Sequence, residues 1–218
     1  MAKAIQLYSL ATPNGQKVSV ALEELGLAYE AHTIDIRKGD QFSDEFKKIN
    51  PNSKIPAIVD PDGPGGKPLA VFESGAILLY LSEKAGGKLL PSDPTQKWEA
   101  LSWLFWQIGG VGPMFGQFGH FHKYAPEKIE YGINRYKTEV KRLLAVLEKQ
   151  LEGRDYIIGS EYTLADVATF PWVRCLDTGY NAADVVELDS FKNVKDWVAR
   201  CEARPASKAG LNVTPFPK

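Results

Sequence analysis

The sequence has few cysteines, no surplus of charge of either sign and no long hydrophobic run. Its 218 residues contain two cysteines, Cys175 and Cys201, too few for a disulfide scaffold and typical of a reducing compartment. Lys and Arg total 26 against 27 Asp and Glu, so the basic excess of most nucleic-acid-binding proteins is missing. The longest apolar stretch, residues 76–81, is too short to span a bilayer. We therefore expect a cytoplasmic protein that binds neither nucleic acid nor membrane.

The composition is that of a folded protein without a bound metal. Hydrophobic residues make up 44% and charged residues 24% of the chain, the balance of an ordinary globular protein. The histidines stand in no H-x-x-x-H arrangement and the cysteines form no C-x-x-C pair, so the sequence carries no metal signature. A chain of this length suits one large domain or two modest ones.

Strand-like and helical runs alternate before residue 90. The strand-like runs span residues 5–8, 29–36, 57–59 and 69–72, and the helical ones span residues 18–25, 42–49 and 74–84. A turn-rich segment between the last two strand runs indicates a hairpin with a long loop. The order βαβ then ββα predicts a mixed four-stranded sheet with helices packed on it, as in a thioredoxin-like domain.

Every long pattern after residue 90 is helical. Apolar residues step by three and four from Ile129 to Leu151, which predicts a long helix. Thr163 and Asp166 have the spacing of a capping box, and Pro171 predicts a kink in the helix that follows. We therefore expect an α/β domain over residues 1–86, a linker over 87–94 and an all-helical bundle over 95–218.

The turn after the first strand, Thr12-Pro13-Asn14-Gly15, is the first segment that carries chemistry. A thioredoxin-like domain that performs redox chemistry has a C-x-x-C pair at this position. No cysteine occurs here or anywhere in residues 1–174, so a thiol would have to come from a small molecule. Taken alone, the residues favour a plainer interpretation, a tight turn with Thr12 or Asn14 capping a helix.

Two further segments could bind an amino-acid-like ligand. A cis Ile55–Pro56 bond would turn the backbone of Ile55 outward to pair with a peptide, although a trans bond is commoner. The expected helix at residues 74–84 begins with Ser74, whose hydroxyl and free backbone N–H groups suit a carboxylate. Glu73 could hold an ammonium beside that carboxylate. A simple serine cap is the alternative.

In their order and spacing, these motifs resemble the glutathione transferase superfamily. The matching segments are T-P-N-G at 12–15, N-P-N-S-K-I-P at 50–56, E-S-G-A-I-L-L-Y-L at 73–81 and W-L-F-W-Q at 103–107. The first and last of these, with G-D-Q-F at 39–42, are similar to the nu class, close to bacterial disulfide-bond oxidoreductases. The resemblance covers essentially the whole chain. It implies the glutathione transferase fold and a homodimer.

The resemblance also implies a glutathione site. Glu73 and Ser74 would hold the γ-glutamyl end, and the Ile55 backbone would hold the cysteinyl unit. The glycyl carboxylate would lie near Gln41 and Lys54. The remaining implied residues are Thr12 and Asn14, which face the sulfur, and Arg135, which reaches a ligand in the neighbouring subunit.

The chemistry at the sulfur needs little from the protein. A free thiol has a pKa of about 8.5, and lowering that pKa by about two units requires roughly 2.7 kcal/mol. One or two hydrogen bonds to a thiolate, at about 1.5–3 kcal/mol each, supply this without a general base. Tyr8 and Ser9 come too early in the chain to serve instead.

The implied reaction is thiol–disulfide exchange in which bound glutathione, or glutathione disulfide, supplies the sulfur. No metal or protein thiol takes part. The alternatives are conjugation of glutathione to electrophiles, reduction of organic hydroperoxides, or a glutathione-binding interaction protein with little turnover. The small disulfide, electrophile or peroxide is not named by the sequence.

Overall fold

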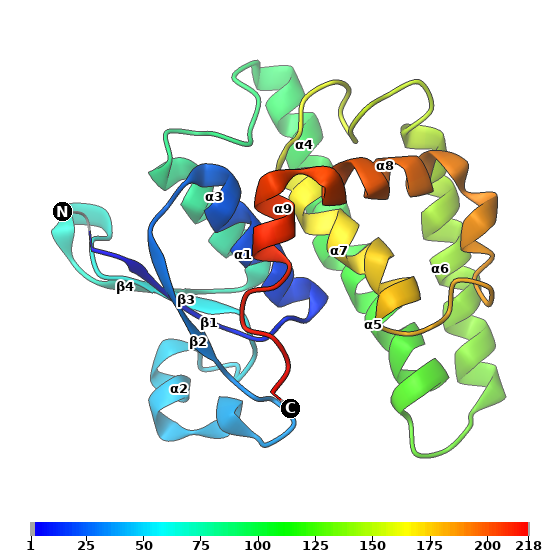
Figure 1. The fold of residues 1–218 in the computed structure, drawn as a ribbon, viewed down its shortest axis with the longest axis horizontal. Helices are drawn as coiled ribbons and strands as arrows, with labels where there is room; N and C mark the ends of the chain where they lie inside the picture. Colours follow the sequence, from blue (N-terminus) through cyan, green and yellow to red (C-terminus); the bar gives the residue numbers. More distant parts are fainter. Residues whose placement is uncertain (1–2, 218) are drawn as a thin grey trace. The chain divides into compact units, whose positions relative to one another are not determined.

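The computed structural model describes residues 3–217 and divides them into two compact units. The first contains residues 3–89 and 204–217, and the second contains residues 90–203 (Figure 1). The division differs from the expected helical domain over 95–218, because the end of the chain belongs to the first unit.

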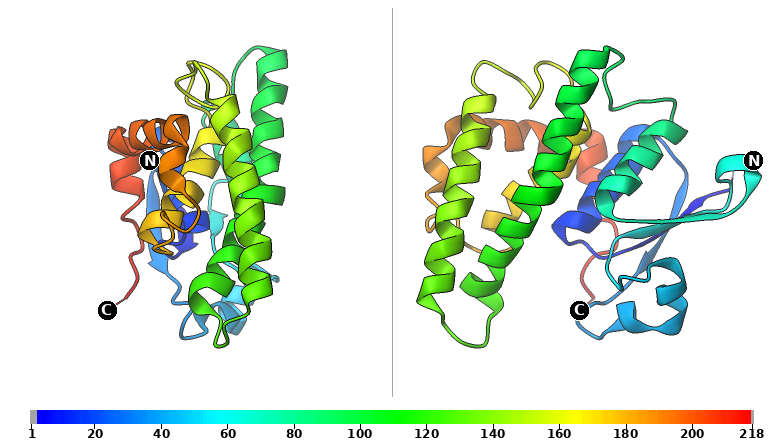
Figure 2. Two further views of the ribbon diagram at one scale, coloured as in Figure 1. Left: turned by 90° about the vertical axis from the view of Figure 1, so that its right-hand side faces the viewer. Right: turned by 180° about the vertical axis from the view of Figure 1, so that it is seen from behind.

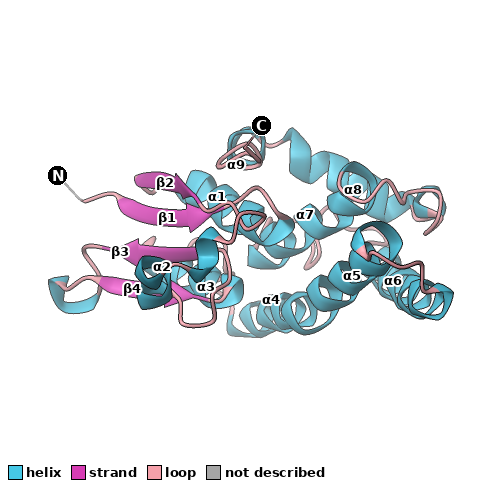
Figure 3. Cartoon of the chain, turned by 90° about the horizontal axis from the view of Figure 1, so that it is seen from below, coloured by secondary structure: helices cyan, strands magenta, loops and turns pink. Residues whose placement is uncertain are grey.

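A mixed four-stranded sheet forms the centre of the first unit, as predicted. Strands β1 (Ile5–Ser9), β2 (Tyr29–Thr33), β3 (Ala57–Asp60) and β4 (Leu69–Phe72) lie in the order β2-β1-β3-β4 (Figure 3). β1 pairs with β2 in parallel and with β3 antiparallel, and β3 and β4 form the expected antiparallel hairpin. A short helical turn, η2 (Pro64–Gly66), lies in its loop.

Two helices pack against each other on this unit, α1 (Pro13–Leu25) and α3 (Ser74–Lys84). Thr12 caps α1 and Pro13 occupies its first turn, where a missing N–H costs nothing. Gly26 ends α1 in the left-handed conformation, as its position after the apolar run predicts. Between β2 and β3 lie a short 3-10 turn, η1 (Asp40–Phe42), and a helix, α2 (Asp44–Ile49). Ser43 caps α2.

The C-terminal segment returns to α1. Helix α9 (Pro205–Gly210) packs on α1 so closely that a Cβ on Gly210 would lie 2.6 Å from Val20 Cα (Figure 1). Ser19 Oγ donates to the Gly210 carbonyl at 2.7 Å, and the Ala11 N–H donates to the Thr214 carbonyl at 2.9 Å. These contacts explain why residues after 203 belong to the α/β unit.

The second unit is helical, as expected. Its α-helices are α4 (Pro94–Trp106), α5 (Gly112–Gly119), α6 (Glu130–Gln150), α7 (Leu164–Thr178) and α8 (Lys192–Ala203). Figure 2 shows α6 as one long uninterrupted helix, matching the predicted periodicity. Two π-helical turns, η3 (Gln107–Val111) and η4 (His120–Tyr124), flank α5, and a 3-10 turn, η5 (Leu188–Ser190), precedes α8. No helix in the described part of the chain is long and apolar enough to cross a membrane.

The start of α7 depends on one buried carboxylate. Thr163 and Asp166 form the predicted capping box. Asp166, fully buried, also accepts hydrogen bonds from the Ile157 N–H and from Trp197 Nε1, both at 2.9 Å. Burial raises the pKa of Asp166, and these donors oppose that shift. One side chain therefore joins α7, α8 and the preceding loop. Pro171 lies inside α7, and the kink there stays a prediction.

We expect Asp166→Ala to destabilise the protein strongly. It would leave four buried donors without their acceptor: the N–H groups of Ile157, Thr163 and the Trp197 indole, and the Thr163 hydroxyl. At roughly 1–3 kcal/mol for each unpaired donor, the free energy of unfolding should fall by about 4 kcal/mol or more. Urea unfolding measures this loss. The control is Asp196→Ala, an exposed aspartate on α8, which should change stability by less than about 0.5 kcal/mol. Equal midpoints for the two variants would contradict the role of Asp166.

Candidate functional site

The turn between β1 and α1 places Thr12 and Asn14 at a helix N-terminus. Thr12 is half-buried, and its Oγ1 accepts the Gly15 N–H at 3.3 Å and donates to the Leu10 carbonyl at 3.5 Å. The second bond is long, so the hydroxyl proton is available to a better acceptor. Asn14, half-buried, stands in the first turn of α1. The plain capping role of Thr12 is thus present, and it leaves a donor at the positive end of the helix.

Gly15 determines how closely this turn approaches the sheet. A Cβ at this position would lie 2.0 Å from the Leu10 carbonyl oxygen and 2.4 Å from Ser9 Oγ. Ser9 is buried, and Tyr8 lies in β1 with its ring stacked on His32 at 4.8 Å. Tyr8 is a sheet residue, as expected, and β1 continues one residue past its expected end to include Ser9. Glycine is therefore required for the backbone path that presents Thr12.

Glu73 and Ser74 stand together at the start of α3. Glu73 is the N-cap, is exposed, and has a φ of 70° that few non-glycine residues adopt. Ser74 is 7% exposed, and its Oγ accepts a hydrogen bond from Lys17 Nζ at 3.3 Å. Strain of this kind is found at ligand sites. The two residues thus combine a carboxylate, a hydroxyl and a helix N-terminus.

Lys17 is the residue that the sequence analysis missed. It lies on α1 and is 1% exposed, although lysine is rarely buried. Burial lowers the pKa of its ammonium to about 7, against the opposing effect of the Glu73 carboxylate. Through Ser74, this side chain connects the helix that carries Thr12 to the N-terminus of α3.

Gln41, Lys54 and Ile55 lie on the segments that lead to β3. Gln41, in η1, is 9% exposed, and its Nε2 donates to the Ile36 carbonyl at 3.4 Å. Its Oε1 is buried with no partner among residues 3–217. Lys54 is exposed, and Ile55 lies two residues before β3, outside the sheet ladder. The Ile55–Pro56 bond is cis, the less common of the two alternatives that the sequence left open.

Family models match both units. The model for the glutathione S-transferase N-terminal domain matches residues 11–84, and the model for the C-terminal domain matches residues 110–205. The chain belongs to the glutathione S-transferase family. The resemblance to the glutathione transferase superfamily is therefore confirmed.

Individual members of this glutathione transferase family are closely similar over most of the chain. The disulfide-bond oxidoreductase YghU of Escherichia coli K12 is 50% identical over 94% of this chain and 73% of its own. A glutathione transferase family member from Pseudomonas fluorescens Pf-5, solved with two glutathiones bound, is 52% identical, with coverage of 96% and 93% and a TM-score of 0.94. A glutathione transferase from Pseudomonas putida, solved with one glutathione disulfide per subunit, is 54% identical, with coverage of 96% and 91% and a TM-score of 0.93.

The second unit of this glutathione transferase contains Arg135 and both cysteines. Arg135 is exposed on α6. Cys175, in α7, and Cys201, in α8, are both thiols. Burial raises the pKa of Cys175 to about 11, and Cys201 is fully buried. The structure thus does not bring Arg135 into the same unit as the other predicted site residues.

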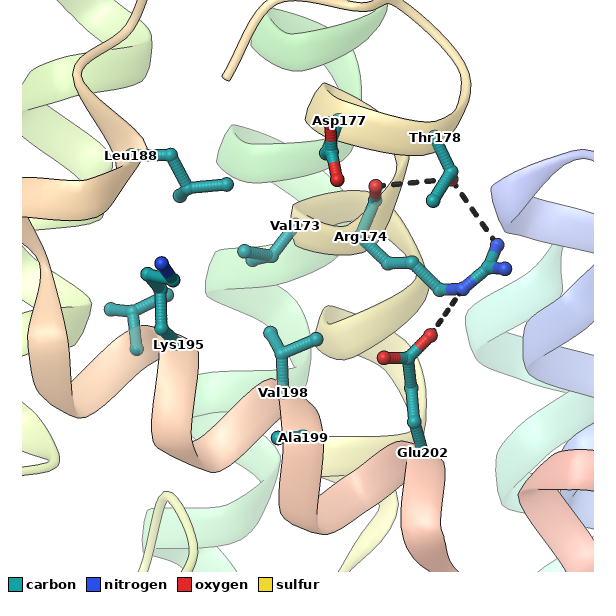
Figure 4. A pocket seen from close by; sticks show the side chains of 10 residues that line it. Val173, Arg174, Asp177, Thr178, Leu188, Lys195, Val198, Ala199 and Glu202 are labelled. Atoms are coloured by element: carbon teal, nitrogen blue, oxygen red, sulfur yellow. Dashed lines mark hydrogen bonds and ion pairs between the residues drawn. The ribbon is translucent and has the colours of Figure 1, made fainter. Parts of the chain in front are cut away.

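A recess between α7 and α8 is lined by none of the predicted site residues. Val173, Val198 and Leu188 form its apolar wall, and Arg174 binds Glu202 at its edge (Figure 4). Among residues 3–217, no three His, Cys, Asp or Glu side chains gather as a metal site. The candidate site of the first unit therefore consists of Thr12, Asn14, Glu73 and Ser74 with their supporting residues.

We expect Gly15→Ala to displace the turn that carries Thr12. The added methyl group meets backbone at 2.0 Å, and such overpacking costs about 1–3 kcal/mol. Thermal unfolding and titration with glutathione measure the loss of stability and of affinity. Gly109→Ala is the control, because a Cβ at Gly109 meets nothing within 4 Å. Equal melting temperatures and equal glutathione affinities in the two variants would show that the turn tolerates a side chain at position 15.

Proposed function

We propose that this protein is a cytoplasmic, nu-class glutathione transferase that reduces disulfide bonds with bound glutathione. The observation that carries the proposal is a thioredoxin-like unit whose helix N-terminus presents Thr12 and Asn14 where a redox unit has cysteines. The α/β unit has no cysteine of its own, so the reacting sulfur comes from the ligand. YghU, 50% identical, is a disulfide-bond oxidoreductase.

The N-terminus of α1 stabilises the thiolate of glutathione. The Thr12 hydroxyl gives up its long bond to the Leu10 carbonyl and donates to the sulfur, and the Asn14 amide supplies a second donor. The helix dipole favours the same negative charge. Two such bonds provide the roughly 2.7 kcal/mol that lowers the thiol pKa by about two units. The protein therefore needs no general base.

The rest of glutathione binds at the end of the sheet where β3 begins and β4 ends. Ser74 and the N-terminus of α3 bind the γ-glutamyl carboxylate, and Glu73 binds its ammonium. The backbone of Ile55 pairs with the cysteinyl unit as a neighbouring strand would. The unpaired Gln41 Oε1 accepts the glycyl N–H, and the exposed Lys54 faces the terminal carboxylate.

The reaction is a pair of exchanges at sulfur. The glutathione thiolate attacks one sulfur of the substrate disulfide, which forms a mixed disulfide and releases the other sulfur as a thiolate. A second glutathione thiolate then attacks the mixed disulfide, giving glutathione disulfide and the second substrate thiolate. Two electrons pass from two glutathiones to the substrate. Conjugation to electrophiles or reduction of hydroperoxides uses the same thiolate and is the alternative reaction.

Three variants test this function. The double variant Cys175→Ser, Cys201→Ser should keep its rate of disulfide reduction, since the buried, high-pKa Cys175 thiol is a poor nucleophile at neutral pH. The double variant Thr12→Ala, Asn14→Ala should raise the pKa of the bound thiol by about two units and lower kcat/KM at pH 7 roughly 20-fold. Thr12→Ser retains the hydroxyl and should remain active.

The assay compares a small disulfide, an aryl halide and a hydroperoxide in parallel, and ultraviolet absorbance reports the thiol pKa. Faster turnover of the aryl halide or hydroperoxide would replace disulfide reduction by one of the alternatives. No turnover with tight binding would favour an interaction protein. A thiol pKa that is the same in the wild type and in the Thr12, Asn14 double variant would contradict the assignment of these residues.

A homodimer completes the proposed site. Trp98 and Phe105, 70% and 59% exposed, stand seven residues apart on one face of α4. Large apolar side chains gathered on one face are typical of an interface. In this dimer the exposed Arg135 binds a carboxylate of the glutathione in the neighbouring subunit through two parallel hydrogen bonds. Lysine cannot reproduce that pair of bonds.

We expect Arg135→Lys to impair glutathione binding almost as much as Arg135→Ala. The control is Arg142→Ala on the same helix, whose guanidinium is paired with Glu139. Heterodimers of Arg135→Ala subunits with Thr12→Ala, Asn14→Ala subunits should regain part of the activity, since one site then has neither defect. Verified heterodimers that recover nothing would show that Arg135 does not act across the interface.

A further inference from the structure

Lys17 is a buried cation that the proposed reaction does not use. Its side chain is 1% exposed, and among residues 3–217 its Nζ has one hydrogen-bond partner, Ser74 Oγ at 3.3 Å. An ammonium group carries three donors. Burying a charge with so few partners costs free energy. Because its one partner, Ser74, belongs to the candidate site, Lys17 is a candidate for a role in ligand binding.

The charged groups around Lys17 leave it with little compensation. Helices α3 and α9 pack against α1. At the start of α3, the negative charge of the Glu73 carboxylate raises the pKa of Lys17, but this effect is smaller than the opposing effect of burial. The remaining charged or titratable groups on these helices do not compensate the Lys17 charge. On α3, Tyr80 and Lys84 bind Asp60, and Glu83 is exposed. On α9, Lys208 is exposed, and Arg204, the N-cap of that helix, binds Glu24.

The hydrogen bond that Lys17 donates to Ser74 leaves the Ser74 hydroxyl free to act as a donor toward a ligand. A hydroxyl has one proton to donate and two lone pairs that accept. Because Ser74 Oγ accepts from the Lys17 Nζ, its own proton is left to point toward a ligand. Ser74 is also the first residue of α3, where unpaired N–H groups attract an anion.

We propose that Lys17 is a positioning residue, which orients the Ser74 hydroxyl toward the ligand's carboxylate and takes up a proton when that carboxylate binds. The inference rests on the proposed function for the placement of the γ-glutamyl carboxylate at Ser74. It adds a proton-linked group, supplied by α1, to that site.

The charges on Lys17 and on the ligand determine how the affinity for the ligand changes with pH. Without ligand, burial holds the pKa of Lys17 at about 7, so near neutral pH a large part of the side chain is uncharged. In the proposed complex the ligand brings its carboxylate to Ser74, the hydrogen-bond partner of Lys17, and its ammonium to Glu73. The carboxylate on the directly bonded residue outweighs the ammonium, favours the charged form of Lys17 and raises its pKa. Binding therefore takes up a proton above pH 7, and affinity falls as the pH rises from about 7 to 8.5. Below pH 6 Lys17 is already charged and this dependence disappears.

Titration calorimetry with S-methylglutathione tests the proposal, because a blocked thiol removes the proton that thiolate formation would release. Measurements at pH 7.5 in buffers of different ionisation enthalpy give the number of protons taken up. For the wild type we expect about half a proton or more from Lys17. Lys17→Met should lose this uptake and bind at least tenfold more weakly at pH 6.5. The control is Lys208→Met, an exposed lysine on α9, which should match the wild type.

Two further variants separate positioning from mere structural support. Lys17→Arg keeps a permanent charge, so it should bind well with no proton uptake and no pH dependence between pH 7 and 8.5. After Ser74→Ala, a further Lys17→Met change should cost less affinity than it does in the wild type, because part of the effect of Lys17 passes through that hydroxyl. Circular dichroism confirms that each variant is folded, and the wild-type proton count needs no variant at all.

The outcomes distinguish this inference from the function on which it rests. Normal binding without proton uptake in the wild type, or equal uptake in Lys17→Met, would overturn the role of Lys17 and leave the glutathione site in place. A wild-type protein that does not bind S-methylglutathione or glutathione would overturn both.

Discussion

Burial of α1 on every side is the constraint on which the first unit depends. Residues 15–22 are all buried, although helices at protein surfaces normally keep a polar face in water. The polar members of this run each have a partner: Gln16 donates to the Leu211 carbonyl, Ser19 to the Gly210 carbonyl, and Lys17 to Ser74 Oγ. The helix is thereby tied to α9 and α3 at once, and its N-terminus has a fixed direction. A thiolate can be stabilised there without reorganisation of the protein.

The parts of the fold that depend on local sequence could be predicted. Helix α3 has its expected bounds, 74–84, and α1 ends before Gly26, because caps and turn residues act on their immediate neighbours. The hairpin and the capping box at Thr163 were predicted for the same reason. The second strand was expected to reach residue 36 and ends at Thr33. Its apolar pattern continues past the point where the partner strand stops at Ser9.

The parts that depend on distant contacts could not be predicted. The return of α9 to α1 follows from the space left by Gly210 beside Val20, and no periodicity in the sequence reports such a fit. The π-helical turns at Gln107–Val111 and His120–Tyr124 escape detection because one added residue barely alters a helical pattern. The sequence does not reveal Lys17 as a buried residue, because lysine side chains usually lie at the protein surface. Its place directly before Val18, in a run of small and apolar residues, was the available signal.

In the proposed complex, α1 acts on two groups whose proton equilibria oppose each other: the ligand thiol at its N-terminus and the side chain of Lys17. Binding at the N-terminus of α1 lowers the pKa of the ligand thiol, which releases a proton near neutral pH. Binding of the carboxylate at Ser74 raises the pKa of Lys17, which takes one up. For reduced glutathione the two changes largely cancel, so affinity stays nearly constant with pH while the bound ligand becomes a thiolate. The cost of burying Lys17 in the free protein is then offset in the complex, where the ligand supplies the missing negative charge.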